Sequence, residues 1–363
     1  MGNRLCKDLK HNTIERKFSG GTALERRGIT AAGNFIIDHI KVVDLWPDEG
    51  MLSLIIQEKR STGGCACNVL IDLARLQTGI PLYGIGLVSN DEDGEFMIEN
   101  LKSSGVDVSM MRFMNDVSTS YTDVMTVEST GNRTFFHNKG VNKYLDIKDF
   151  DFSRITTKIF HIGYILLLDT LDGPDAEFGT RMARLLKSAK ESGLKTSVDL
   201  VSESSYRFNK IVSPALKYTD YLILNEIEAG RTSGHEIREK DGGLNTENLK
   251  RTLEVLMEGG KSELVCIHFP EGAYAGLKGS EPLFIPSHQC PKGYIASVVG
   301  AGDAFCAGML YGIHEEWELE RSMRFANAMA AVCLTDMTTS GGMKSIEETL
   351  QVMNELPLRM LKV

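Results

Sequence analysis

The sequence lacks any hydrophobic run long enough to cross a membrane. Its longest apolar stretch runs from Ile162 to Leu168, whereas a transmembrane helix needs roughly 20 apolar residues. Residues 1–28 also lack the apolar core of a secretory signal, because Lys and Arg are mixed there with Asp and Glu. We therefore expect an N-terminal extension over residues 1–28, no membrane partner, and a cytoplasmic protein.

The sequence also has few cysteines and no excess of basic residues. The chain has seven cysteines in 363 residues, and they lack the spacing of a disulfide framework, which favours a reducing compartment. The net charge is −9, whereas a nucleic-acid-binding protein usually has a basic face. We expect no nucleic-acid partner. The remaining composition, 42% hydrophobic and 25% charged, is that of a globular protein with a large core.

Strand-like and helix-like segments alternate from residue 29 onward. Apolar, β-rich runs predict strands at 29–43, 80–87, 158–165, 195–199, 220–224 and 263–268. Helical periodicity predicts helices at 68–76, 93–104, 175–192, 207–217 and 246–258. This alternation is typical of a mostly parallel sheet covered by helices, so we expect an α/β fold with a doubly wound sheet.

Two stretches interrupt the alternation. The first is residues 51–59, and the second is the pair 120–127 and 133–138, joined by Ser129-Thr130-Gly131-Asn132. Gly and Asn supply the geometry of a hairpin turn, so the pair predicts a β-hairpin. We expect a small sheet drawn from about 40–60 and 118–140. It serves either as a lid over a site or as a fixed edge hairpin.

The most informative segment is Gly300-Ala301-Gly302-Asp303, which precedes a helical pattern that continues to Met329. Small residues at 300–302 allow backbone N–H groups to converge at a helix N-terminus, where the partial positive charge favours a phosphate. Asp303 would lie in the first turn, placed to accept a proton from an attacking hydroxyl. The same residues also fit a glycine-rich turn with Asp303 as a helix N-cap.

Several motifs, in the same order, resemble those of the ribokinase-like (PfkB) family of sugar and nucleoside kinases. Gly300 to Phe305 resembles the C-terminal signature of that family, and Gly63-Gly64 to Asn68 resembles the N-terminal one. Further matches are Gly33-Asn34 to Asp38, Asn225 to Glu228, and Ala326-Asn327-Ala328. The resemblance implies a three-layer α/β/α sandwich with a Rossmann-type, mostly parallel sheet and a small β-sheet lid, in one kinase domain over 29–363.

The resemblance also implies roles for individual residues. Asp303 would be the catalytic base, and Gly300, Ala301 and Gly302 would form its anion hole. Residues implied on the acceptor side are Asp38, Gly63, Gly64 and Asn68. Residues implied on the ATP side are Asn225, Glu228, Gly272 and Asn327. Glu228 would hold Mg²⁺ through water, in keeping with the preference of Mg²⁺ for hard oxygen ligands.

Some positions depart from the family pattern. Ser297 and Val298 stand where the family usually has Asp-Thr. This difference leaves uncertain whether a monovalent cation binds beside the anion hole. Cys65 stands where ribokinase proper has Lys, so ribose is not the favoured substrate. Cys65-Ala66-Cys67 lacks the second pair of a zinc site, and small side chains at a crowded helix start explain it better.

The expected activity is transfer of the γ-phosphoryl group of ATP, with Mg²⁺, to a hydroxyl of a small sugar-like molecule, most simply a CH₂OH. A nucleoside and a sugar phosphate are alternative acceptors, and Arg133 and Lys139 are the cations available for the latter. A catalytically silent metabolite-binding regulator is a further alternative. The resemblance implies a homodimer formed through the lid.

Overall fold

The computed structural model describes residues 26–202 and 207–361, so most of the predicted N-terminal extension lies outside the described residues. The main sheet has eight strands. Their order is β16 (Leu283–Pro286), β15 (Gly272–Leu277), β14 (Leu264–Phe269), β13 (Tyr221–Asn225), β12 (Lys195–Leu200), β9 (Ile159–Ile165), β1 (Ile29–Gly33) and β4 (Leu82–Ile85). Neighbours from β14 to β4 run parallel, and β15 runs antiparallel to both β14 and β16.

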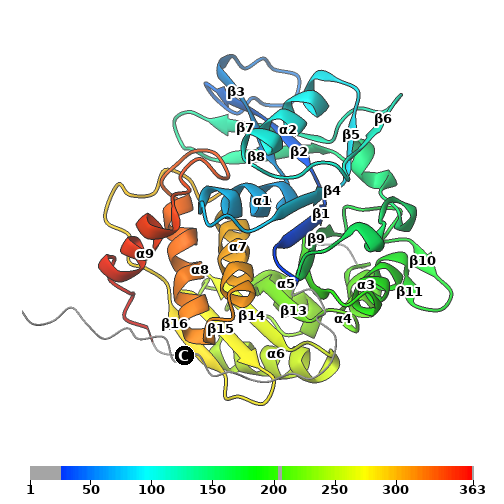
Figure 1. The fold of residues 1–363 in the computed structure, drawn as a ribbon. Helices are drawn as coiled ribbons and strands as arrows, with labels where there is room; N and C mark the ends of the chain where they lie inside the picture. The colour runs from blue at the N-terminus through cyan, green and yellow to red at the C-terminus, as the bar shows by residue number, and fades with distance from the viewer. Residues whose placement is uncertain (1–25, 203–206, 362–363) are drawn as a thin grey trace, which may run out of the picture.

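Helices cover both faces of this sheet (Figure 1). One face buries a hydrophobic core beneath α1 (Cys65–Arg75), α2 (Glu92–Ser103), α7 (Ala301–His314), α8 (Leu319–Cys333) and α9 (Ile346–Glu355). A second core lies beneath α3 (Arg181–Glu191), α4 (Phe208–Leu216), α5 (Glu226–Ser233) and α6 (Thr246–Gly259). The predicted three-layer α/β/α sandwich is therefore confirmed.

The predicted strand over residues 29–43 is in fact two strands in two sheets. Gly33 has φ +114°, and a Cβ at this position would overlap the carbonyl oxygen of Gly163 on β9. Only glycine tolerates this close approach in that conformation, and the chain leaves the main sheet there. It continues as β2 (Ile36–Val43), which belongs to a four-stranded sheet of order β3-β2-β7-β8.

The small sheet contains the predicted hairpin. Strands β7 (Tyr121–Val127) and β8 (Arg133–Asn138) pair antiparallel, which confirms the hairpin expected from the turn residues between them. On the other side of β2 lies β3 (Ile55–Gly63), which begins later than the sequence suggests. In Figure 1 this sheet stands above α1, beyond the end of β1.

The sequence-based boundaries fail in a few places. The expected helix over 175–192 begins only at Arg181, because the Thr180 side chain caps it by accepting from the Ala183 N–H at 3.2 Å. Before it, β10 (Pro174–Asp175) and β11 (Gly179–Thr180) form a short hairpin. Strands β15 and β16 were not expected. The remaining elements are β5 (Leu87–Ser89), β6 (Arg112–Met114), and the 3₁₀ helices η1 (Gly140–Tyr144), η2 (Ile147–Asp149) and η3 (Phe152–Arg154).

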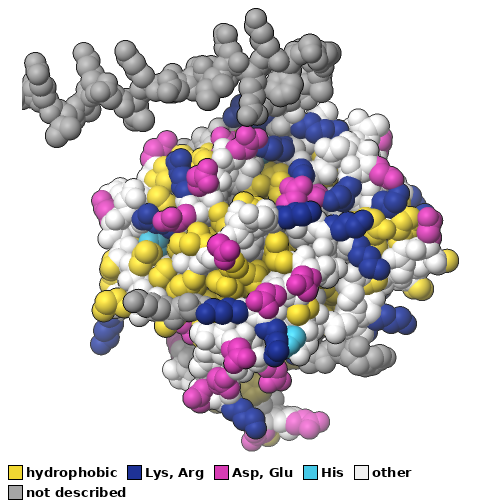
Figure 2. Space-filling view, turned by 90° about the horizontal axis from the view of Figure 1, so that it is seen from below, with side chains coloured by type: hydrophobic (Ala, Val, Ile, Leu, Met, Phe, Trp, Pro, Cys, Tyr) yellow, Lys and Arg dark blue, Asp and Glu magenta, His cyan; other side chains and the backbone are white. Residues whose placement is uncertain are grey.

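The carboxyl ends of β1, β9, β12 and β13 meet at one edge of the main sheet, since these strands are parallel neighbours. In such folds this edge is where ligands bind. Within residues 26–202 and 207–361 no helix has the length and hydropathy to span a membrane. The face in Figure 2 shows a broad band of hydrophobic side chains, bordered by mixed charges of both signs.

Candidate active site

Helix α7 presents an uncapped N-terminus at the ligand-binding edge of the sheet. Its N-cap is Gly300, with φ +84° and no side-chain hydrogen bond to the first turn. A Cβ on Gly300 would overlap the Thr339 carbonyl oxygen, so glycine is required there. Asp303 is the third helical residue, and the alternative reading of Asp303 as the N-cap is wrong. The free N–H groups of the first turn form an anion-binding geometry.

Asp303 is 7% exposed, and its carboxylate accepts hydrogen bonds from Asn68 and Tyr164. The Asn68 amide donates to Oδ2 at 2.7 Å, and the Tyr164 hydroxyl lies 3.3 and 3.4 Å from the two carboxylate oxygens. Thr339 Oγ1 donates to Asn68 Oδ1 at 2.9 Å, which turns the Asn68 NH₂ group toward Asp303. Burial raises the pKa of Asp303, and the hydrogen bonds from Asn68 and Tyr164 oppose that rise.

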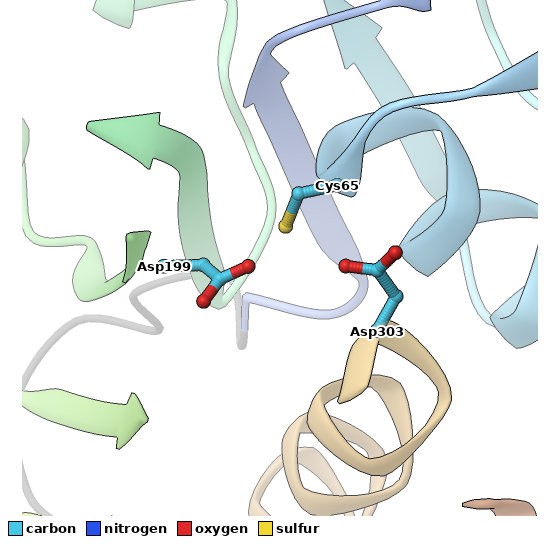
Figure 3. A group of neighbouring side chains, drawn as sticks. All are labelled: Cys65, Asp199 and Asp303. Atoms are coloured by element: carbon cyan, nitrogen blue, oxygen red, sulfur yellow. The ribbon is translucent and has the colours of Figure 1, made fainter. Parts of the chain in front are cut away.

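A second carboxylate, Asp199 at the end of β12, faces Asp303 across Cys65 (Figure 3). The Cys65 sulfur and one oxygen from each carboxylate all lie within 4.8 Å of one another. Burial, followed by repulsion from Glu228 and Asp303, raises the pKa of Asp199 well above its usual range. Sequence reasoning missed Asp199 and Tyr164. The signal for both was their position at the end of a correctly predicted parallel strand.

Asn225 and Glu228 form a capping box at the start of α5. The Asn225 side chain accepts from the Glu228 N–H, and the Glu228 carboxylate accepts from the Asn225 N–H at 3.1 Å. Glu228 also accepts from the Asn225 amide at 2.8 Å and from the Ser202 hydroxyl at 2.9 Å. Burial raises the pKa of Glu228 to about 7. Both residues line one cavity of about 140 Å³, together with Asp199, Asp303, Gly300 and Gly302.

Asp38 lies on β2, near Asp303. Burial, then repulsion from Asp303, raises the pKa of Asp38 to about 7, while Arg133 acts in the opposite direction. The neighbouring Gly63 leaves no room for a side chain, because a Cβ there would overlap Asp38 Oδ2. Gly64 has φ +86°, and its Cβ would lie 2.5 Å from the Asn34 carbonyl oxygen. The predicted acceptor residues are thus close neighbours.

The cavity of about 140 Å³ is called the acidic cavity below, because carboxylates line it. An apolar cavity of about 290 Å³ adjoins it, and both cavities are lined by His268 and Gly302. Its lining is mainly hydrophobic and includes Phe269, Ile295, Val298, Phe305, Ala330 and Leu334. Asn327, predicted on the ATP side, is among the residues that line it, and its amide donates to the Pro286 carbonyl at 3.2 Å. Gly272 does not line the apolar cavity. Gly272 follows the turn between β14 and β15, and a Cβ on it would lie 2.5 Å from the Ile285 carbonyl oxygen.

Ser297 occupies the position that made a monovalent cation uncertain. Its hydroxyl accepts from the Val299 N–H at 3.1 Å, closing a local turn before α7. Val298 is 71% exposed. A neutral hydroxyl in a turn is a weaker cation ligand than a carboxylate, and the dependence on a monovalent cation stays an open prediction.

An uncapped helix N-terminus, a buried carboxylate beside it and an adjoining apolar cavity are typical of a phosphotransferase that uses a nucleotide. A family model described as pfkB family carbohydrate kinase matches residues 27–346. The chain belongs to this family. Membership confirms the predicted class, an ATP-dependent sugar kinase that phosphorylates an alcohol group.

The chain is also similar to individual characterised proteins. It is 22% identical over 308 residues to the 5-dehydro-2-deoxygluconokinase of Shouchella clausii, covering 83% of this chain and 90% of the relative. It is 27% identical over 293 residues to the protein of the same name from Clostridium perfringens, covering 78% and 81%.

Two solved structures illustrate the fold. Ribokinase from Arabidopsis thaliana, complexed with ribose and ATP, superposes with a TM-score of 0.73 at 19% identity, covering 91% of this chain and 99% of that one. The nucleoside kinase of Methanocaldococcus jannaschii superposes with a TM-score of 0.69 at 19% identity, covering 90% and 98%. At this identity the likeness shows the fold alone.

Substituting Gly63 by Ala tests the acceptor side of the site. The new Cβ must displace the Asp38 carboxylate, so we expect KM for the acceptor to rise roughly tenfold or more, while KM for ATP stays within about threefold. Steady-state kinetics with each substrate varied in turn measures both. Gly259→Ala is the control, because Gly259, like Gly63, does not have a positive φ, and a Cβ there would meet no atom within 4 Å. Equal KM values for the Gly63 variant and wild type would contradict the assignment.

Proposed function

We propose that Asp303 is the general base of this sugar kinase, acting where the acceptor site and the nucleotide site meet. The observation that carries the proposal is its position. It lies in the first turn of an uncapped helix, lines the acidic cavity, and is hydrogen-bonded to Asn68 on the acceptor side. An acceptor hydroxyl bound beside Asp38 would lose its proton to Asp303 as it attacks the phosphoryl group.

The apolar cavity suits the nucleoside of ATP. Aromatic and aliphatic side chains would cover the faces of a base, and the shared residues His268 and Gly302 lead toward the α7 N-terminus. Burial lowers the pKa of His268 to about 4, so this ring is neutral at physiological pH. The N–H groups at 301–303 would then face the transferring phosphoryl group and stabilise its developing charge.

The family implies Mg²⁺, and the donor set fits it. Glu228 and Asn225 offer hard oxygen ligands in the acidic cavity, whose lining includes the carboxylates of Asp199 and Asp303 and, among the described residues, no Lys or Arg. Glu228, with Asn225, would hold Mg²⁺ through water. When bound, the ion would neutralise phosphate charge, while the chain's own residues orient the acceptor and take its proton.

Replacing Asp303 by Asn tests the base. The isosteric amide cannot accept the hydroxyl proton, so we expect kcat to fall about 10² to 10⁴-fold, with the Kd for ATP changed less than about threefold. A coupled ADP-release assay and calorimetric titration of ATP measure the two quantities. Asp241→Asn, at an exposed position, is the matched control. A variant at position 303 that keeps wild-type turnover would sink the assignment.

We further propose that the acceptor is a sugar acid. The name of the relatives, 5-dehydro-2-deoxygluconokinase, denotes a kinase acting on such an acid. Here Arg133 lies at a register position that shares a sheet face with Asp38, since β2 and β8 both pair with β7. Among the described residues Arg133 makes no salt bridge, its guanidinium donates a hydrogen bond to the Met337 carbonyl at 3.5 Å, and Asp38 attracts it electrostatically. It is therefore available to a carboxylate. Lys139, in contrast, is paired with Asp169.

The sugar-acid proposal is tested by comparing hexonate-type acids with the corresponding neutral sugars. We expect Arg133→Ala to lower kcat/KM for the acids about tenfold or more, mainly through KM, because a charge-assisted hydrogen bond contributes about 1.5–3 kcal/mol. Neutral sugars should change less than about threefold. Lys139→Ala is the control. A wild-type preference for neutral sugars or nucleosides, or equal losses on both substrate classes, would contradict the proposal.

A homodimer through the small sheet is proposed on the exposed hydrophobic side chains there. They include Trp46, Leu52, Ile55, Phe135 and Phe136, which are between 50% and 78% exposed. Clustered apolar surface of this kind marks interaction sites. Light scattering coupled to gel filtration should give twice the chain mass of 40.1 kDa, and Leu52→Asp should shift the protein toward monomer. A monomeric wild-type protein at micromolar concentration would rule the dimer out.

A further inference from the structure

A buried chain of three polar side chains ends beside the catalytic carboxylate. Ser197 on β12 and His161 on β9 are register partners, and their Oγ and Nδ1 atoms lie 3.1 Å apart. His161 Nε2 lies 3.2 Å from the sulfur of Cys65, at the start of α1. All three residues are 0% exposed. The Cys65 thiol in turn lies between Asp199 and Asp303 (Figure 3).

With Asp303 ionised, as a general base must be, the protons of this chain have one arrangement that satisfies every group. Burial lowers the pKa of His161 to about 3, so the ring is neutral and carries a single N–H. Burial and the two neighbouring carboxylates raise the pKa of the Cys65 thiol well above its usual range, so it keeps its proton. The ionised Asp303 carboxylate only accepts hydrogen bonds, and the Cys65 sulfur lies within 4.8 Å of an oxygen of Asp303 and of an oxygen of Asp199. The single S–H is therefore directed at Asp303.

It follows that the Cys65 sulfur accepts from His161 Nε2–H, and His161 Nδ1 accepts from the Ser197 hydroxyl. In the other tautomer Nε2 would compete with the carboxylates for the thiol proton. The chosen arrangement aligns three donors in series, each directed toward the acidic cavity. Aligned hydrogen bonds in a buried, low-dielectric setting polarise one another, which makes the terminal thiol a better donor than an isolated one.

We propose that Cys65 is a positioning residue for the kinase reaction: its thiol, anchored by His161 and Ser197, donates to the Asp303 carboxylate. The inference rests on the proposed role of Asp303 as base. Cys65 thus places a neutral donor beside the base. The thiol is buried and protonated, which makes it neither a nucleophile nor a redox centre.

Other groups also act on Asp303, so the test must isolate the thiol. Titratable side chains that interact electrostatically with Asp303 come from several elements: Asp38 on β2; Cys65, Cys67 and Asp72 on α1; Tyr164 on β9; Asp199 on β12; Glu228 on α5; Cys306 on α7; and Cys333 on α8. Cys67 is the matched control, because it is equally buried on the same helix but its thiol contacts Met97 Sδ at 3.5 Å.

The experiment measures kcat against pH for Cys65→Ala, Cys65→Ser and Cys67→Ala. Removing a donor to the ionised base raises the pKa of Asp303. The acidic limb of the profile, where kcat falls at low pH because Asp303 becomes protonated, should therefore move to higher pH by about half to one unit in Cys65→Ala. That shift is a further loss of about three- to tenfold at acidic pH relative to the alkaline plateau. Cys65→Ser keeps a donor and should retain the wild-type limb, and Cys67→Ala should leave the limb in place.

Ser197→Ala keeps the inference testable if Cys65→Ala does not fold, as judged by circular dichroism and thermal melting. It removes the far end of the chain and should move the limb in the same direction by a smaller amount. A Cys65→Ala profile parallel to wild type, or an equal shift in Cys67→Ala, would overturn the positioning role. Turnover that survives Asp303→Asn would instead overturn the proposed function, so the two failures are distinguishable.

Discussion

The burial of several carboxylates at one edge of the main sheet is the constraint on which the rest of the site depends. Removing a charged group from water is costly unless hydrogen bonds or opposite charge replace its hydration. Asp303 is compensated by Asn68 and Tyr164 and by its place in the first turn of α7. Glu228 accepts hydrogen bonds from Asn225 and Ser202, and burial still raises its pKa and that of Asp199. The Mg²⁺ that we propose at Glu228 and Asn225 would add opposite charge to this cavity.

Several residues hold the fold and serve the site at the same time. The Asn225–Glu228 capping box fixes the start of α5 and points carboxylate oxygen into the acidic cavity. Gly33 lets β1 pass against β9 and then releases the chain into the small sheet, which carries Asp38 over the site. Because these contacts are shared, substitutions there should affect stability and binding together, whereas Asp303 can be neutralised with less structural cost.

The sequence predicted the fold class and the family better than the packing. Asp303, Asn68 and Asp38 could be assigned to one site because their motifs resemble those of the family in order and spacing, and the parallel strands were identified because buried strands are continuous apolar runs. Asp199, Tyr164 and the His161–Cys65 contact were missed, since each depends on which strands become neighbours, and sequence periodicity does not encode that order. The break at Gly33 was missed because a close approach to Gly163, distant in sequence, causes it.

The central claim is that this site moves a phosphoryl group from ATP to an acceptor hydroxyl. The most direct measurement is ³¹P nuclear magnetic resonance of a reaction containing the wild-type protein, Mg-ATP and a sugar-acid acceptor. The account predicts that a phosphomonoester signal appears at the rate at which ATP becomes ADP, in equal amount and with no matching rise in inorganic phosphate. Conversion of ATP to ADP and inorganic phosphate alone, or an unchanged ATP signal across a broad acceptor panel, would contradict it.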